Sequence, residues 1–403
     1  MVGGLLSVAS YAQEAVRSGD FFERTVSASR ALRHTYDQQR VSLPWIEVYE
    51  FRTESDEFDL NRQEYTARLT PTSPGVRKAQ SALFQHYRGK LSLVTNNYLN
   101  DQLQAAYNHW TRLYLRQQEL ALYTRLRSVY QDKQQVYKKQ VYQEDFDFAQ
   151  LIDTQQKINE LNIKVQELQI SVRALKTQAG LAEEEVAFDD MISVDQIEDV
   201  LRNEGHQLPT DVDYVYRHEL LNKEIAVEHA EKRKLFDFAQ VKYGGGNVQE
   251  QLLNERISVG VGLKIPAYGK RNLKIQEMRI KQQELELEHQ MFNRAAARET
   301  QNLLLQTHSK IEIYRAYEQA SAEEKQSYQE LKQFITNKEG QDALFLLKID
   351  RSQIEAQLEK LKRLEEIYED YLDYLALSQN MFARPFKNYL LNPPNTLEIL
   401  REE

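Results

Sequence analysis

The sequence predicts a mainly helical fold with a small β part, in which a unit of long helices and one β-hairpin occurs twice. Three observations predict this fold: long stretches without proline, two similar entries to the longest of these stretches, and segments with alternating apolar residues. Proline removes a backbone donor and clashes with the preceding turn, so a proline-free run of good helix formers can continue as one helix. The eight prolines are Pro44, Pro71, Pro74, Pro209, Pro266, Pro385, Pro393 and Pro394.

The two longest helices begin in similar ways. Pro266 follows Pro71 by 195 positions, and Gly269 follows Gly75 by 194. Further along, Leu347 follows Leu151 by 196 positions. A near-constant offset over such a length indicates an internal duplication.

Each copy contains the same elements in the same order. In the first copy we expect a short helix over about 14–39, strands over 45–53 and 63–72, a long helix to about 142, and a medium helix over 148–178. We expect the last helix to stop at Gly180, because glycine adopts the left-handed conformation that ends many helices. At 1.5 Å per residue, a helix of nearly 70 residues would span about 100 Å. The predicted unit is therefore a strut, about two helices wide.

The second copy repeats this pattern. Its expected elements are a short helix over about 212–234, strands over 235–243 and 256–265, a long helix from 270 to about 337–340, and a medium helix over 343–381. The predicted division of the chain is a signal peptide over 1–12, a first repeat over 13–180, a linker over 181–211, a second repeat over 212–382 and a tail over 383–403. The segments 182–208 and 383–403 are expected to be less regular.

The N-terminus is similar to the apolar end of a secretory signal. Small residues, Ser10 and Ala12, precede a cleavage point, but the basic start of such a signal is missing because the first arginine is Arg17. We interpret this as a signal peptide whose beginning is truncated or misassigned. A frayed cytoplasmic N-terminus is the alternative.

Composition excludes several functions. The net charge of −9 comes from 61 acidic and 52 basic residues that are finely interspersed, which argues against nucleic acid as a partner. The chain has no cysteine, and His218-Glu219 lacks the second histidine of a metalloprotease helix. Gly244 to Gly246 is not followed by the Lys-Ser/Thr of a phosphate loop. We therefore predict no enzyme activity, no metal and no cofactor.

The last predicted strand has one apolar side. Every second residue from Ile257 is a large aliphatic, which is the period of a strand with one apolar and one wet face. The predicted outward face consists of Ile257, Val259, Val261, Leu263 and Ile265. A transmembrane strand needs about 9 to 11 residues, and the four predicted strands are just long enough. Four strands cannot close a barrel, so a lipid-facing sheet would need several chains.

These features resemble the TolC-like outer-membrane channel family, the outer membrane factors of tripartite efflux pumps and type I secretion systems. The best-matched pieces are 257–269, similar to the family's strand and helix entry, and 148–153, similar to the start of its returning helix. The resemblance covers about 14–381. It implies a homotrimer whose four strands per chain form a 12-stranded β-barrel in outer-membrane lipid, continued by an α-helical barrel across the periplasm. It also implies a periplasmic adaptor (membrane fusion protein) and an inner-membrane transporter as partners, with the chain as a passive export duct.

Two features depart from this family. The first hairpin carries Glu47, Glu50, Arg52, Glu64 and Arg68, which simple alternation places on both faces. A soluble periplasmic scaffold or adaptor with long coiled-coil hairpins, lacking a true membrane barrel, is therefore an alternative. A cytoplasmic coiled-coil organiser is a third.

The second departure concerns the far end of the helices, where the family narrows its duct, often with acidic residues near the second helical turn. Ala343 and Leu346 stand at the corresponding positions here. Nearby acids are Glu144, Asp145, Asp147 and Asp342. One hypothesis is that they line a periplasmic aperture and favour cations. A solvated acidic turn is the alternative.

Overall fold

The structure is a computed structural model. It describes residues 15–33, 43–55, 63–142, 146–188, 191–203, 212–244, 256–263, 269–336, 343–382, 386–391 and 395–396. The chain forms two compact units: unit 1 comprises Met1–Arg30, Tyr98–Pro209 and Ala295–Glu403, and unit 2 comprises Ala31–Asn97 and Thr210–Arg294. Each unit therefore takes segments from both predicted copies, and the repeat boundaries stay a prediction.

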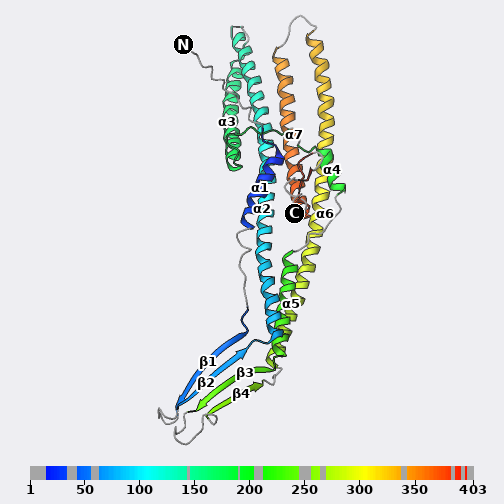
Figure 1. The fold of residues 1–403 in the computed structure, drawn as a ribbon. Coiled ribbons are helices and arrows are strands. Elements are labelled where there is room, and N and C mark those ends of the chain that lie inside the picture. The colour runs from blue at the N-terminus through cyan, green and yellow to red at the C-terminus, as the bar shows by residue number, and fades with distance from the viewer. Residues whose placement is uncertain are drawn as a thin grey trace, which may run out of the picture. The chain divides into compact units, whose positions relative to one another are not determined.

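The two long helices are α2 (Pro74–Gln140) and α6 (Gly269–Thr336), of 67 and 68 residues (Figure 1). Helix α6 begins one residue before the predicted position 270. At the start of α2, the Ser73 hydroxyl accepts a hydrogen bond from the Val76 N–H at 3.3 Å. Pro74 occupies the first helical position, where its missing N–H removes no helical hydrogen bond. Sequence chemistry thus explains where α2 starts.

The returning helices are α3 (Phe148–Gln178) and α7 (Ala343–Leu377). The bounds of α3 coincide with the predicted ones, and Gly180 has the left-handed φ of +70° that the predicted stop requires. The Leu181 N–H donates to the Lys176 carbonyl at 2.8 Å, which closes the end of the helix. Helix α7 stops four residues earlier than predicted, and a 3-10 turn covers Asn380–Phe382.

The core of unit 1 is rich in large aromatic residues. Trp110 and Tyr107 of α2 and Tyr368, Tyr371 and Tyr374 of α7 are fully buried in it. Helix α1 (Ser18–Arg33), which begins later than the predicted 14 and whose predicted end at 39 lies outside the described residues, adds Phe21 and Phe22. A second, smaller cluster joins α2, α3 and α7 through Leu126, Tyr130, Ile158, Leu161 and Ile354.

Buried tyrosine hydroxyls hold two irregular segments against this core. The Tyr107 hydroxyl donates to the Lys387 carbonyl at 2.6 Å and accepts from the Tyr389 N–H at 3.1 Å. The Tyr368 hydroxyl donates to the Ile192 carbonyl at 2.5 Å. Burial is the main cause that raises the pKa of both tyrosines, so they remain neutral donors at physiological pH.

The expected irregularity of 182–208 and 383–403 is wrong in part. Helix α4 (Val194–Asn203) buries Ile197 and Leu201 in the core of unit 1. Phe386, Tyr389 and Leu390 are also buried there, and β5 (Lys387–Asn388) pairs with β6 (Asn395–Thr396). Among the described residues of these two segments, the longest element is α4, of 10 residues. The local sequence carried no information on which of their side chains would be buried.

The sheet belongs to unit 2. Its strands β1 (Ile46–Ser55), β2 (Gln63–Pro71), β3 (Phe236–Gly244) and β4 (Ile257–Leu263) are antiparallel and lie in chain order (Figure 1). The two predicted hairpins thus join into one sheet through β2 and β3. Helix α5 (Val212–Lys232) precedes β3. Among the described residues, none of the helices has both the length and the apolar character that crossing a membrane requires.

Candidate functional site

Strand register divides the sheet into two chemically different faces. Directly opposed residues share a face, and neighbours along a strand alternate. Tyr49 faces Leu69, which faces Ala239, which faces Val261. Every paired residue whose side chain is on the same side of the sheet as these four is uncharged. We call it the uncharged face: Tyr49, Phe51, Thr53, Ser55, Gln63, Tyr65, Ala67, Leu69, Ala239, Val241, Tyr243, Ile257, Val259, Val261 and Leu263.

The opposite face carries the charged residues at the paired positions of the strands, while Glu47 and Asp237 lie where the register shifts. We call it the charged face; its ionisable members are Glu50, Arg52, Glu54, Glu64, Arg68 and Lys242. Arg52 pairs with Glu50 at 2.6 Å, and Lys242 lies 3.9 Å from Glu64. These charges are compensated by neighbours on the same face, so the sheet is strongly amphipathic.

The pairing assigns four of the five charges singled out in the first hairpin to one face. Glu50 and Arg68 are directly opposite each other, and both Arg52 and Glu64 belong to the same face as this pair. Glu47 falls where the register shifts between Ile46 and Val48. An extra residue at such an irregularity has no partner of its own, so the register assigns Glu47 to neither face. The charges at the paired positions of the hairpin therefore leave the uncharged face intact.

The predicted outward residues of β4 share this uncharged face. Val259 and Leu263 are 74% and 73% exposed, and Ile257 and Val261 are also exposed. Ile265 lies outside the described residues. From the neighbouring hairpin, Tyr49 and Phe51 are exposed as well. A contiguous exposed patch of apolar side chains is typical of a surface that meets lipid or another protein.

A close contact on the charged face explains one glycine. The Phe238 ring lies against Gly262, and the Arg68 guanidinium stacks over the same ring, 3.5 Å from its centroid. A Cβ at Gly262 would approach Phe238 Cε1 to 2.3 Å. The ring thus fills the space that a side chain would need.

Replacing Gly262 by alanine is expected to destabilise the sheet by about 1–3 kcal/mol, because the trapped ring must move. Gly260→Ala is the matched control: its Cβ would meet only the flexible Gln240 side chain, at 3.1 Å. Thermal unfolding followed by circular dichroism should give a lower Tm for Gly262→Ala than for Gly260→Ala. Equal Tm values would contradict this account.

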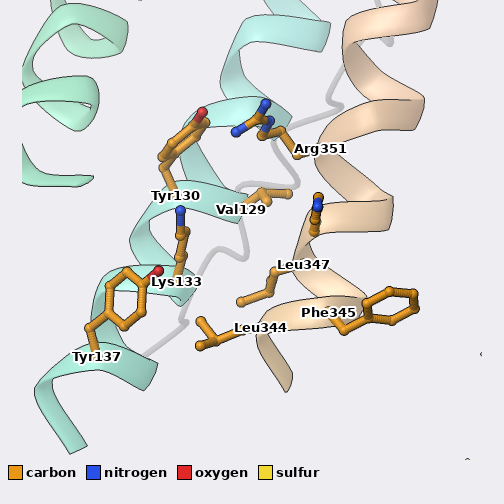
Figure 2. Close-up of a pocket in the computed structure, with 9 residues that line it drawn as sticks. Val129, Tyr130, Lys133, Tyr137, Leu344, Phe345, Leu347 and Arg351 are labelled. Atoms are coloured by element: carbon orange, nitrogen blue, oxygen red, sulfur yellow. The ribbon is translucent and has the colours of Figure 1, made fainter. Parts of the chain in front are cut away.

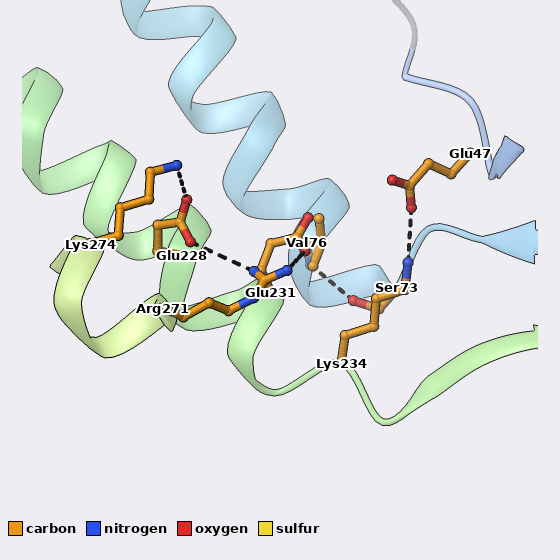
Figure 3. Close-up of polar contacts among 8 residues, drawn as sticks. All are labelled: Glu47, Ser73, Val76, Glu228, Glu231, Lys234, Arg271 and Lys274. Atoms are coloured by element: carbon orange, nitrogen blue, oxygen red, sulfur yellow. Dashed lines mark hydrogen bonds and ion pairs between the residues drawn. The ribbon is translucent and has the colours of Figure 1, made fainter. Parts of the chain in front are cut away.

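Ion pairs join α5 to the start of α6, and β1 to the segment before β3, within unit 2 (Figure 3). Arg271, in the first turn of α6, contacts Glu231 at 3.0 Å and Glu228 at 3.7 Å, both on α5. Lys274 adds a contact to Glu228 at 2.5 Å. Before β3, Lys234 binds Glu47 at 2.9 Å. These contacts fix where the strands leave the helices.

The predicted aperture acids are only partly described. Glu144, Asp145 and Asp342 lie outside the described residues. Asp147 caps α3: its carboxylate accepts from the Ala149 N–H at 2.9 Å and from the Gln150 amide at 3.2 Å. That local role explains an acid at this position. Whether Asp147 also lines an aperture stays a prediction.

A pocket of about 330 Å³ lies between α2 and α7, near the ends of these helices (Figure 2). Its lining residues are Val129, Tyr130, Lys133, Tyr137, Leu344, Phe345, Leu347, Lys348 and Arg351. Sequence reasoning missed it. In the sequence, the pocket is indicated only by basic and aromatic residues spaced one to two helical turns apart. Solvent-exposed helices show the same spacing, so it does not identify a pocket.

Comparison with known proteins identifies the fold. No family model and no curated protein matches the chain. Solved structures of outer-membrane channels do match: this chain has their fold, an outer membrane factor fold similar to TolC.

Three of these structures illustrate the similarity. The open state of the Neisseria gonorrhoeae MtrE channel aligns with a TM-score of 0.55 and 14% identity, over 89% of this chain and 86% of that one. Vibrio cholerae VceC aligns with a TM-score of 0.56 and 12% identity, over 90% and 93%. CusC aligns with a TM-score of 0.54 and 12% identity, over 89% and 88%.

Proposed function

We propose that the chain is an outer-membrane channel subunit that forms a passive trimeric export duct for a tripartite efflux pump or type I secretion system. It would be located in the outer membrane and extend into the periplasm. The observation that carries this proposal is the uncharged face, a largely exposed sheet surface that has no charged side chain at any of its paired positions. Lipid tolerates such a face and penalises charge there.

The edges of the sheet support assembly from several chains. Among the described strands, β1 pairs only with β2, and β4 pairs only with β3. Unpaired backbone groups are costly in hydrocarbon, so a lipid-facing sheet must close on itself. Three copies would supply the twelve strands of one barrel, with each β1 pairing to the β4 of a neighbouring copy.

Exposed apolar stripes on the helices also favour neighbouring copies. On α6, Leu273, Ile280, Leu287 and Met291 recur at helical spacing and are exposed. On α3, Ile163 and Ile170 are likewise exposed. Stripes of this kind are typical of helices that pack against a partner. Helix packing between copies would form the proposed α-helical barrel, to which a periplasmic adaptor and an inner-membrane transporter would connect.

Membrane fractionation followed by light scattering tests this function. The mature chain, produced with a functional signal peptide, is expected in the outer-membrane fraction as a trimer that needs detergent. A soluble monomer or dimer would contradict the proposal and favour a periplasmic scaffold.

Within this function we propose that Glu144, Asp145, Asp147 and Asp342 line the periplasmic aperture. Replacing Asp145, Asp147 and Asp342 by asparagine is expected to lower the cation selectivity of the channel in planar bilayers. Asparagine still caps a helix, so the change at position 147 removes charge and keeps the cap. Asp199→Asn, at an exposed position of α4, is the control. Unchanged selectivity in the triple variant would reject this role.

A further inference from the structure

The pocket between α2 and α7 carries an excess of positive charge. Lys133 of α2 and Lys348 and Arg351 of α7 line it, and none of its lining residues is acidic. Figure 2 shows Lys133 between Tyr130 and Tyr137, with Leu344 and Leu347 projecting from the facing helix. All these residues belong to unit 1. Three cations thus converge on one hollow that also has apolar and aromatic walls.

The surrounding acids compensate this charge only in part. The Arg351 Nε donates to Glu355 at 3.1 Å, one helical turn further along α7. Among the described residues, no carboxylate forms an ion pair with Lys348. Burial and then the charge of Arg351 lower the pKa of Lys133, and Asp153 of α3 only partly opposes them. The pocket would therefore gain electrostatic free energy by taking up a negative group.

Two further features favour an anion with an apolar body. Leu344, Phe345 and Leu347 lie in the first turns of α7, whose N-terminal end carries partial positive charge. Lys133 lies over the rings of Tyr130 and Tyr137, at 5.8 and 5.4 Å from their centroids. The rings hold the ammonium group over the pocket without neutralising it.

We propose that this pocket is a binding site for a small amphipathic organic anion, a carboxylate or sulfonate attached to an aromatic or aliphatic group. Lys348 and Arg351 would bind the acidic group, while Leu344, Leu347 and the two tyrosines would contact the apolar part. A volume of about 330 Å³ suits a molecule of one or two rings. The site is built within unit 1 and does not depend on membrane insertion or trimer formation.

Isothermal titration calorimetry with two matched probes tests the site. The purified full chain in a nonionic detergent is titrated with 1-naphthoate and with 1-naphthylmethylammonium, which share a ring system and differ in charge. We expect binding of the anion and no saturable binding of the cation. Lys348→Gln, which breaks no ion pair among the described residues, should weaken naphthoate binding about tenfold, and adding Arg351→Gln should weaken it further.

Lys139→Gln is the matched control, an exposed lysine on α2 that does not line the pocket. It should bind naphthoate as the unchanged chain does, and circular dichroism should show each variant to be folded. Equal affinity for the two probes would assign the binding to the detergent or to apolar surface and overturn the proposal. Unchanged naphthoate affinity in folded Lys348→Gln would overturn it as well. If the chain proves not to form an outer-membrane trimer but still binds naphthoate, the proposed function is wrong and the proposed anion site is supported.

Discussion

Replacing Val259 by arginine is expected to remove most of the protein from the outer-membrane fraction. Val259 lies on the uncharged face of β4 and is 74% exposed. Arginine on the lipid face of a barrel costs about 2–4 kcal/mol at mid-membrane. A trimer would incur this cost three times. The measurement is membrane fractionation, with light scattering of the detergent extract.

Ser258→Arg is the matched control for this prediction. It introduces the same side chain one residue earlier, on the charged face and opposite Lys242. It should still assemble and reach the membrane, with at most a modest loss of stability. If Val259→Arg assembles as well as Ser258→Arg, the uncharged face does not meet lipid, and the soluble scaffold becomes the better interpretation.

Replacing Phe386 by alanine is expected to destabilise unit 1 by about 3–5 kcal/mol. Phe386 is only 2% exposed and belongs to the main core, although it follows the last long helix. The lost ring would leave a cavity next to the segment that Tyr107 and Tyr371 hold by hydrogen bonds to the backbone of residues 387–389. Thermal unfolding should show a lowered Tm and a lower yield of folded protein.

Lys387→Ala provides the comparison for Phe386→Ala, because its side chain is exposed at the adjacent position. Its Tm should lie close to that of the unchanged chain. Similar Tm values for the two variants would mean that the segment after α7 contributes nothing to the core.

Features set by local chemistry could be predicted from the sequence. Asp147 caps α3 and Gly180 ends it, so both bounds follow from residue type. The alternation from Ile257 likewise predicted the uncharged side of β4. Each of these signals is contained within a few neighbouring residues.

What could not be predicted depends on contacts between distant residues. The common face of Glu50 and Arg68 becomes clear only when β1 is paired with β2. Phe386 is buried in a core that includes Tyr107, about 280 positions earlier in the chain. The basic pocket needs α2 and α7 together, since Lys133 and Lys348 are on different helices. No single segment contains enough information to reveal them.

The pairing of β2 with β3 sets an order of events during synthesis. Leu69 faces Ala239, a residue that is made 170 positions later. The first hairpin can form early, but the edge of β2 that pairs with β3 stays unpaired until the second hairpin is made. Contacts between residues this distant in sequence also form slowly. An open strand edge is prone to pair with other chains during such a delay. Glu64 and Arg68, on this very strand, would discourage wrong partners until β3 arrives.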